Sequence, residues 1–152
     1  MLKIRGMVEA DQETVKALAI TTGLFGSGEW RSPSLTNLEE GHRWIVAVSE
    51  AEEILGAAYF APEPIAFKLW NTYFLAVNKN SQGKGIGRQI MNWIENLAHQ
   101  EEIRTLMVET SSMESFAQAR GFYQSLGYTR EAEIRDYYGI NDNKVIYLKT
   151  LI

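Results

Sequence analysis

The segment Ser81–Arg88 constrains this chain more than any other part of it. It places two cations among three glycines at alternate positions, which are Gly83, Gly85 and Gly87. The strand-like run Tyr73–Val77 precedes it, and the amphipathic segment Ile86–Ala98 overlaps its end. A glycine-rich turn at a helix start exposes backbone N–H groups, and nearby cations favour an anion there. The segment therefore predicts a strand–turn–helix unit that holds a phosphate or pyrophosphate group.

The length and composition predict one globular domain over residues 1–152. The chain is 45% hydrophobic, and no apolar run approaches the roughly 20 residues that a membrane span needs. The N-terminal stretch Met1–Arg5 alternates instead of forming an apolar signal core, so secretion is not expected. The absence of cysteine excludes disulfides, thiolate metal sites and a cysteine nucleophile, and the predicted compartment is the cytoplasm. His42 and His99 lack zinc-motif spacing, so no metal is expected.

Charge is distributed unevenly along the chain. The net charge of −4 argues against nucleic acid as a partner, because such binders are normally basic. From Pro64 through Ile94 there is no acidic residue, whereas four cations occur: Lys68, Lys79, Lys84 and Arg88. This pattern favours an anion near the glycine-rich turn, and chance clustering on a solvated face is the alternative.

Hydrophobic periodicity predicts a mixed α/β domain. Alternating or apolar runs predict strands over Leu2–Met7, Trp44–Ser49, Ile54–Ala61, Phe67–Val77, Thr105–Glu109, Tyr128–Asp136 and Lys144–Thr150. Helices are expected over Gln12–Leu24 with Asp11 as its cap, Ser34–Glu40, Ile86–Ala98, and Ser115–Leu126 ended by Gly127. The order is β-αα-βββ-α-β-α-ββ, and we expect the aromatic residues Trp70, Phe74, Trp93 and Tyr147 in the core.

Two common nucleotide-binding motifs do not fit the turn. A P-loop needs Ser or Thr after Gly-Lys, whereas Gly85 follows Lys84. In a dinucleotide fingerprint that starts at Gly83, the third glycine would fall at Arg88, and the motif lies in mid-chain. Neither triphosphate hydrolysis nor dinucleotide binding is therefore favoured.

Two motifs together resemble the GNAT superfamily of N-acyltransferases. The pattern Gln82-x-x-Gly85-x-Gly87 resembles the acyl-CoA loop of that family, and Ala119–Tyr128 resembles its A-x-x-F-Y-x-x-L-G-F/Y segment. The resemblance covers essentially the whole chain and implies a mixed central sheet flanked by helices. Many members carry Asn where this chain has Phe116, so Ser111 or Ser112 is expected to take its place.

The resemblance implies acetyl-CoA as co-substrate. The splayed strand of the family binds pantetheine through its backbone, which here corresponds to Leu75, Ala76 and Val77. The amides of the glycine-rich turn would bind the pyrophosphate, with Lys79, Lys84 or Arg88 as a supplementary cation. The turn residues concerned are Gln82, Gly83, Lys84, Gly85, Ile86, Gly87 and Arg88.

The resemblance also implies direct attack of an amine on the thioester. An N–H near Val77 would polarise the carbonyl, and Tyr123 would protonate the departing thiolate. A half-buried tyrosine that only anchors the core is the alternative for Tyr123. Glu109 is the preferred general base, while Glu29, Tyr73, Asp136 and a water relay stay open.

The acceptor is expected to be the primary amine of a small molecule. We place Glu29, Trp30 and Tyr138 in its binding site, with Phe25 beside them. A small acceptor is preferred because the chain has neither a second domain nor a conspicuous peptide-binding tract. The alternatives are a protein or peptide N-acetyltransferase and a non-catalytic acyl-CoA sensor. Dimers are common in this family, so a homodimer is a further expectation.

Overall fold

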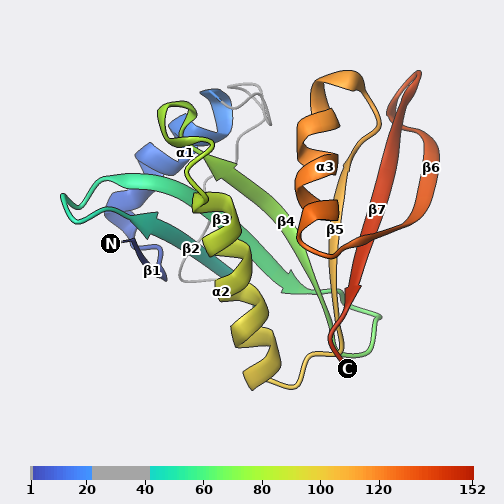
Figure 1. Cartoon of the computed structure of the whole chain (residues 1–152), viewed down its shortest axis with the longest axis horizontal. Coiled ribbons are helices and arrows are strands. Elements are labelled where there is room, and N and C mark those ends of the chain that lie inside the picture. The colour runs from blue at the N-terminus through green and yellow to red at the C-terminus, as the bar shows by residue number, and fades with distance from the viewer. Residues whose placement is uncertain (1, 22–41) are drawn as a thin grey trace. The chain divides into compact units, whose positions relative to one another are not determined.

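The computed structural model describes residues 2–21 and 42–152 as alternating strands and helices (Figure 1). Its seven strands lie in one sheet in the order β1-β2-β3-β4-β5-β7-β6. This mixed sheet with its helices confirms the expected fold class, and the predicted helix Ser34–Glu40 lies outside the described residues. The elements are β1 (Lys3–Gly6), η1 (Glu9–Asp11), α1 (Gln12–Thr21), β2 (Arg43–Val48), β3 (Ile54–Pro62), β4 (Leu69–Val77), η2 (Lys79–Ser81), α2 (Ile86–Gln100), β5 (Thr105–Ser111), η3 (Glu114–Phe116), α3 (Ala117–Ser125), β6 (Thr129–Gly139) and β7 (Asp142–Thr150).

The chain divides into two compact units. Unit 1 comprises Met1–Ala61 and Phe74–Leu97, and unit 2 comprises Pro62–Tyr73 and Ala98–Ile152. Strand β4 and helix α2 each contribute residues to both units. The expectation of one domain over residues 1–152 stays a prediction. No helix of residues 2–21 and 42–152 combines the length and the apolar character that a membrane span requires.

Unit 1 is built on the antiparallel strands β1, β2 and β3. Helix α1 covers one face of these strands, because Val15, Leu18 and Ala19 are buried against Val46 and Ala57. Helix α2 lies on the other face, close to Gly56. Burial of these aliphatic side chains from both faces supplies the main stabilisation of the unit.

The start of α1 differs from the predicted cap. Asp11 lies in the short helix η1, and its carboxylate accepts hydrogen bonds from the Val8 N–H (2.8 Å) and the Arg5 guanidinium (2.7 Å). The hydrogen bond to Arg5 is the main reason that the pKa of Asp11 lies below its usual value. Asp11 therefore ties β1 to the turn before α1.

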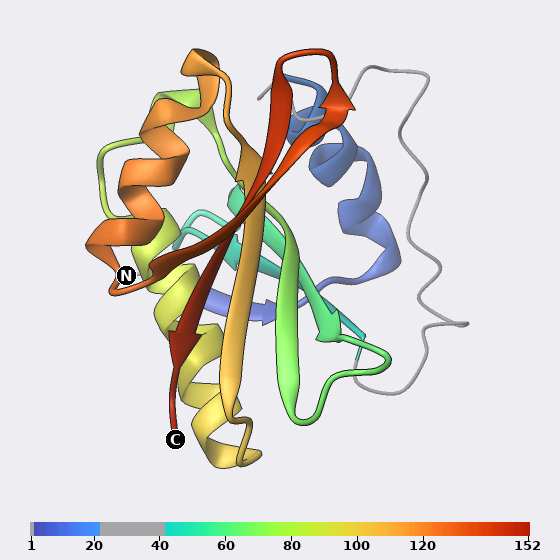
Figure 2. The same ribbon diagram turned by 90° about the vertical axis from the view of Figure 1, so that its right-hand side faces the viewer.

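Unit 2 is built on β5. Residues Thr105–Val108 of β5 pair in parallel with Leu69–Thr72 of β4, and the whole of β5 pairs antiparallel with β7. Strand β6 pairs with the other side of β7, and the two strands twist together toward their hairpin (Figure 2). Trp70 and Tyr147 are buried as predicted, whereas every residue of β6 is exposed.

Candidate functional site

Hydrogen bonds of Asn78 and Gln82, which follow β4 in the chain, hold the start of the glycine-rich turn of unit 1. The Asn78 N–H donates to the carbonyl of Leu55 (2.8 Å), and the Asn78 side chain accepts from the Asn80 N–H (2.9 Å). The Gln82 amide donates to the carbonyl of Val77 (3.3 Å). The predicted loop residue Gln82 therefore connects the turn to the last residue of β4.

The backbone of the turn adopts a conformation that glycine permits. Gly83 and Gly85 both have φ of +80°, and a Cβ built on either would meet no heavy atom within 4 Å. No backbone hydrogen bond of the described turns has the N–H of Gly83 or Gly85 as donor. Helix α2 starts directly afterwards at Ile86, and the first four N–H groups of a helix lack intrahelical partners. The turn thus offers amides and open space that fit a diphosphate.

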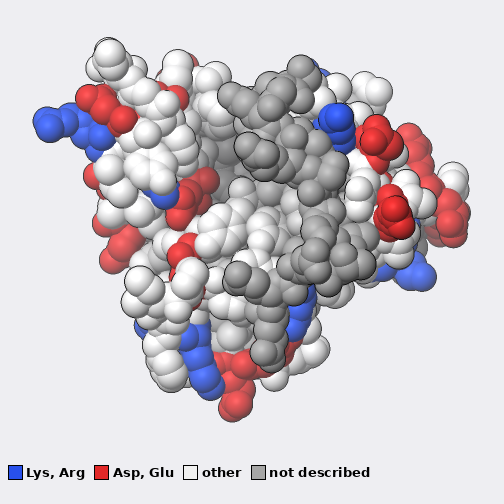
Figure 3. Space-filling view, turned by 180° about the vertical axis from the view of Figure 1, so that it is seen from behind, with Lys and Arg blue, Asp and Glu red and all other residues white. Residues whose placement is uncertain are grey.

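The four cations of the acid-free stretch fall into different units. Lys79, Lys84 and Arg88 are exposed residues of unit 1 around the turn. Lys68 belongs to unit 2, where its Nζ lies 5.9 Å from the centroid of the Phe67 ring. In the view of Figure 3, acidic and basic side chains are interspersed over the described surface.

Tyr123 lies on α3, whose two ends are fixed by specific contacts in unit 2. At the start, the Arg120 guanidinium donates to the carbonyls of Ser111 (2.7 Å) and Met113 (2.8 Å). At the end, Gly127 has φ of +93°, and the N–H of Tyr128 donates to the carbonyl of Tyr123 (3.1 Å). Gly127 thus ends the helix as predicted, through the geometry common at helix C-termini.

Aromatic rings surround Tyr123. Its ring centroid lies 6.0 Å from that of Tyr128 and 6.4 Å from that of Tyr147. Burial raises the pKa of the Tyr123 hydroxyl to about 12, so the phenol stays protonated at neutral pH. The Tyr147 hydroxyl is buried and has no hydrogen-bond partner among the described residues.

Ser111 and Ser112, which were expected to replace the family's Asn, hold the end of β5 to β7. The Ser111 hydroxyl donates to Asp142 and accepts from the Met113 N–H (3.0 Å). The Ser112 hydroxyl accepts from the Asn143 N–H (2.9 Å). Both hydroxyls therefore have structural partners within unit 2.

Glu109 lies on the face of β5 opposite the one that faces α3. Val108 pairs with Tyr147 and Glu109 with Ile146, and successive strand residues point to opposite faces. The Glu109 carboxylate accepts from the Asn71 amide (2.9 Å) and forms a salt bridge with Lys144. Burial lowers the pKa of Lys144, but bonds to Glu109 and Tyr137 outweigh it, so the pKa is raised and Lys144 stays protonated.

A polar network on this face includes residues that sequence reasoning missed. The Asn71 amide also donates to Glu63 (2.8 Å), and the Tyr73 hydroxyl donates to the same Glu63 oxygen (2.6 Å). Burial, followed by the bond to Glu63, raises the pKa of Tyr73. Asn71 is fully buried and lies beside the buried Thr72 in a strand whose other residues are apolar or aromatic, and an amide in such a strand was the available signal.

Of the residues predicted to bind the amine acceptor, Tyr138 lies within the described part of the chain. It is half-exposed near the tip of the β6–β7 hairpin, with its ring 5.0 Å from that of Tyr137. Asp136, an alternative base, accepts from the Asn141 N–H (2.9 Å) within this hairpin. Glu29, Trp30 and Phe25 lie outside the described residues. In residues 2–21 and 42–152, no three His, Asp or Glu side chains gather as a metal ion would require.

Several solved structures share this fold. A structure assigned to the GNAT acetyltransferases, from Desulfovibrio desulfuricans, superposes with a TM-score of 0.89 at 23% identity over 99% of each chain. The ribosomal-protein-S18-alanine N-acetyltransferase from Escherichia coli gives 0.80 at 17% identity, over 99% of this chain and 94% of that one. An aminoglycoside 6′-N-acetyltransferase in complex with coenzyme A superposes with a TM-score of 0.79 at 16% identity, over 99% of this chain and 97% of that one.

The sequence itself also matches a family model. The model for the acetyltransferase (GNAT) domain matches residues 40–130, a stretch that contains the glycine-rich turn, Glu109 and Tyr123. This match spans more than half of the chain and includes both motifs that carried the resemblance. An open glycine-rich turn before α2, a tyrosine on α3 and a matching family model lead to one conclusion: this chain belongs to the GNAT acetyltransferase family.

Proposed function

We propose that this acetyltransferase moves the acetyl group of acetyl-CoA directly to the primary amine of a small molecule. The observation that carries the proposal is the turn with Gly83 and Gly85, whose backbone leaves space for an anion directly before α2. Family membership supports acetyl transfer, and the coenzyme A complex of the aminoglycoside 6′-N-acetyltransferase supports the cofactor.

The turn and the end of β4 would hold the coenzyme. The N–H groups from Gln82 to Arg88 would bind its diphosphate, with Lys79 and Lys84 adding positive charge. The backbone of Leu75, Ala76 and Val77 would bind the pantetheine amides, because a strand edge offers matching donors and acceptors. Bound acetyl-CoA would supply an activated thioester as the acetyl donor.

Two residues of unit 2, Tyr123 and Glu109, would transfer protons in the reaction. In the proposed reaction the unprotonated amine forms the new C–N bond, the C–S bond breaks, and the thiolate becomes a thiol. Tyr123 would donate that last proton, because its raised pKa of about 12 keeps the hydroxyl protonated until it is needed. Glu109 would accept the proton that the ammonium form of the acceptor loses. The second proton, which the nitrogen loses as the amide forms, would return by way of water to Tyr123 and restore its phenol. An N–H near Val77 would stabilise the developing charge on the carbonyl oxygen.

The acceptor class is proposed from the chain itself. Among the similar structures are one that acts on an aminoglycoside and one named for a ribosomal protein, so the fold accommodates both classes. We favour a small molecule because this sequence has no conspicuous peptide-binding tract. A cytoplasmic location and a homodimer stay predictions.

Release of free CoA from acetyl-CoA, measured against amines, polyamines and peptides, tests the proposal. We expect Tyr123→Phe to keep acetyl-CoA affinity and to lower turnover by about 10²-fold or more. Tyr147→Phe is the matched control, because it removes a neighbouring buried hydroxyl that has no partner in the described residues. Unchanged turnover in Tyr123→Phe would remove the acid role, and no binding of acetyl-CoA in calorimetry would refute the proposal as a whole.

A further inference from the structure

Two carboxylates of unit 2 share one amide nitrogen. The Asn71 Nδ2 lies 2.8 Å from Glu63 Oε1 and 2.9 Å from Glu109 Oε1. These distances fix the orientation of the carboxamide, because only its nitrogen can donate to two carboxylate oxygens. The Asn71 side chain therefore lies between the two acids, and its nitrogen donates a hydrogen bond to each of them.

The charges of this network do not balance. Lys144 forms a salt bridge with Glu109, and its raised pKa keeps it positive. Within residues 2–21 and 42–152, the Glu63 carboxylate accepts hydrogen bonds from the neutral side chains of Asn71 and Tyr73 and takes part in no ion pair. The three charged side chains sum to one negative charge, which leaves a place for a single cation beside Glu63.

The carbonyl oxygen of Asn71 adds a second, independent observation. It is buried, and it has no hydrogen-bond partner among the described residues. A buried acceptor without a donor is costly, so such an oxygen points to a donor that binds there. An ammonium group has three donors and no acceptor, so it is the kind of partner that both an amide oxygen and the Glu63 carboxylate can accept.

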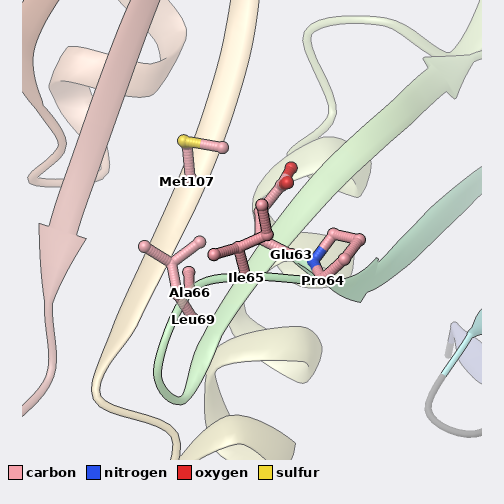
Figure 4. A pocket seen from close by; sticks show the side chains of 6 residues that line it. All are labelled: Glu63, Pro64, Ile65, Ala66, Leu69 and Met107. Atoms are coloured by element: carbon pink, nitrogen blue, oxygen red, sulfur yellow. The ribbon is translucent and has the colours of Figure 1, made fainter.

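An apolar pocket adjoins Glu63. It has a volume of about 330 Å³, and of the six described residues that line it Glu63 alone is charged (Figure 4). The loop before β4 supplies most of its wall, and β5 supplies Met107, which pairs in register with Asn71. The remaining lining residues are Pro64, Ile65, Ala66 and Leu69. A pocket of this size, at the lower end of small-molecule sites, suits one compact apolar group.

We infer that Glu63, with Asn71, anchors the ammonium group of a singly charged acceptor, and that the pocket beside it takes a compact apolar substituent. The acceptor class is thus an arylalkylamine or short alkylamine, not a polycation. This inference rests on the proposed function, because an acetyltransferase needs an acceptor. Its physical basis is Glu63, Asn71 and the pocket. Glu63 is then a specificity-determining residue.

Calorimetry with 2-phenylethylamine, in the protein alone and in protein saturated with CoA, tests the inference without any turnover. Binding is expected, with spermidine weaker. Glu63→Gln should weaken the amine about 10- to 100-fold, because it removes the charge and keeps an oxygen that can accept from Asn71 and Tyr73. Glu13→Gln, an exposed acid on α1, is the matched control and should leave the affinity unchanged.

Two results would overturn the inference: equal affinity of 2-phenylethylamine for Glu63→Gln and the unsubstituted protein, or tighter binding of spermidine. Met107→Glu provides a second check on the pocket, since a carboxylate in its wall should reduce the preference for the aromatic amine over ethylamine. The affinity for CoA is measured in parallel. Loss of CoA binding with intact amine binding would count against the proposed function alone, and the reverse result would count against the amine site alone.

Discussion

Gly56 offers a sharp test of how closely α2 lies on the strands of unit 1. A Cβ built at Gly56 would lie 3.0 Å from Ile90 Cδ1 and 3.1 Å from the carbonyl oxygen of Ala76. The Ile90 methyl group is the end of a flexible side chain and can move, but the Ala76 oxygen is backbone and cannot do so cheaply. The substitution Gly56→Ala therefore forces a displacement of β3, β4 or α2.

The magnitude follows from two opposing effects. Overpacking of a well-packed interior costs about 1–3 kcal/mol, whereas alanine restricts the unfolded chain and returns about 0.4–1 kcal/mol. We expect a net loss of about 1–2 kcal/mol in the free energy of unfolding. For a chain of this size the midpoint of thermal unfolding should fall by roughly 3–6 °C. Since α2 carries the turn of Gly83 and Gly85 at its start, acetyl-CoA affinity should fall as well.

Differential scanning calorimetry, with and without acetyl-CoA, provides the measurement. Gly121→Ala on α3 is the control, because its added Cβ would meet no atom within 4 Å. Helix propensity predicts that this control gains about 1 kcal/mol. If Gly56→Ala melts at or above the temperature of the unsubstituted protein, the close approach of α2 to β3 is not the constraint that we infer.

Three further predictions concern other contacts. Gly85→Ala should lower the affinity for CoA at least about 10-fold by calorimetry, since φ of +80° strains alanine and its methyl group enters the space beside the amides. Gly139→Ala, the control, should leave this affinity unchanged. Asp11→Asn should lower the free energy of unfolding by about 1 kcal/mol at pH 7, measured by denaturant unfolding. This difference should vanish as the pH falls through the lowered pKa of Asp11, because the carboxyl group stabilises the folded state only while it is ionised. Glu109→Gln should lower turnover by about 10²-fold or more, since it removes the proposed proton acceptor and nearly keeps the shape of the side chain; unchanged turnover would show that Glu109 is not the base.

The features of this molecule that depend on residues close together in the sequence were predictable. The turn Ser81–Arg88 follows the end of β4 by a few residues and runs into the start of α2, so its place in the structure follows from local rules. Gly127 likewise ends α3, because a helix terminus is decided within a few residues. For the same reason most strand bounds lie within about two residues of those expected.

The network around Glu63 was not predictable, because it depends on pairing between distant segments. Asn71 and Glu109 meet only through the parallel register of β4 and β5, and Lys144 reaches Glu109 from a third strand. A shift of one residue in either register would turn these side chains to the other face. Asp11 shows the same limit on a smaller scale, since its bond to Arg5 replaced the helix cap that its position suggested.

The position of β7 inside the sheet has a consequence for synthesis on the ribosome. Strand β6 emerges first, yet β7 fills the place between β5 and β6. Until residues 142–150 have left the exit tunnel, β5 keeps an open edge and β6 has no partner, so unit 2 cannot close before then. A stalled chain that ends before Asp142 should therefore be sensitive to proteases and bind chaperones, and one extended past Thr150 by a tunnel-length linker should resist both.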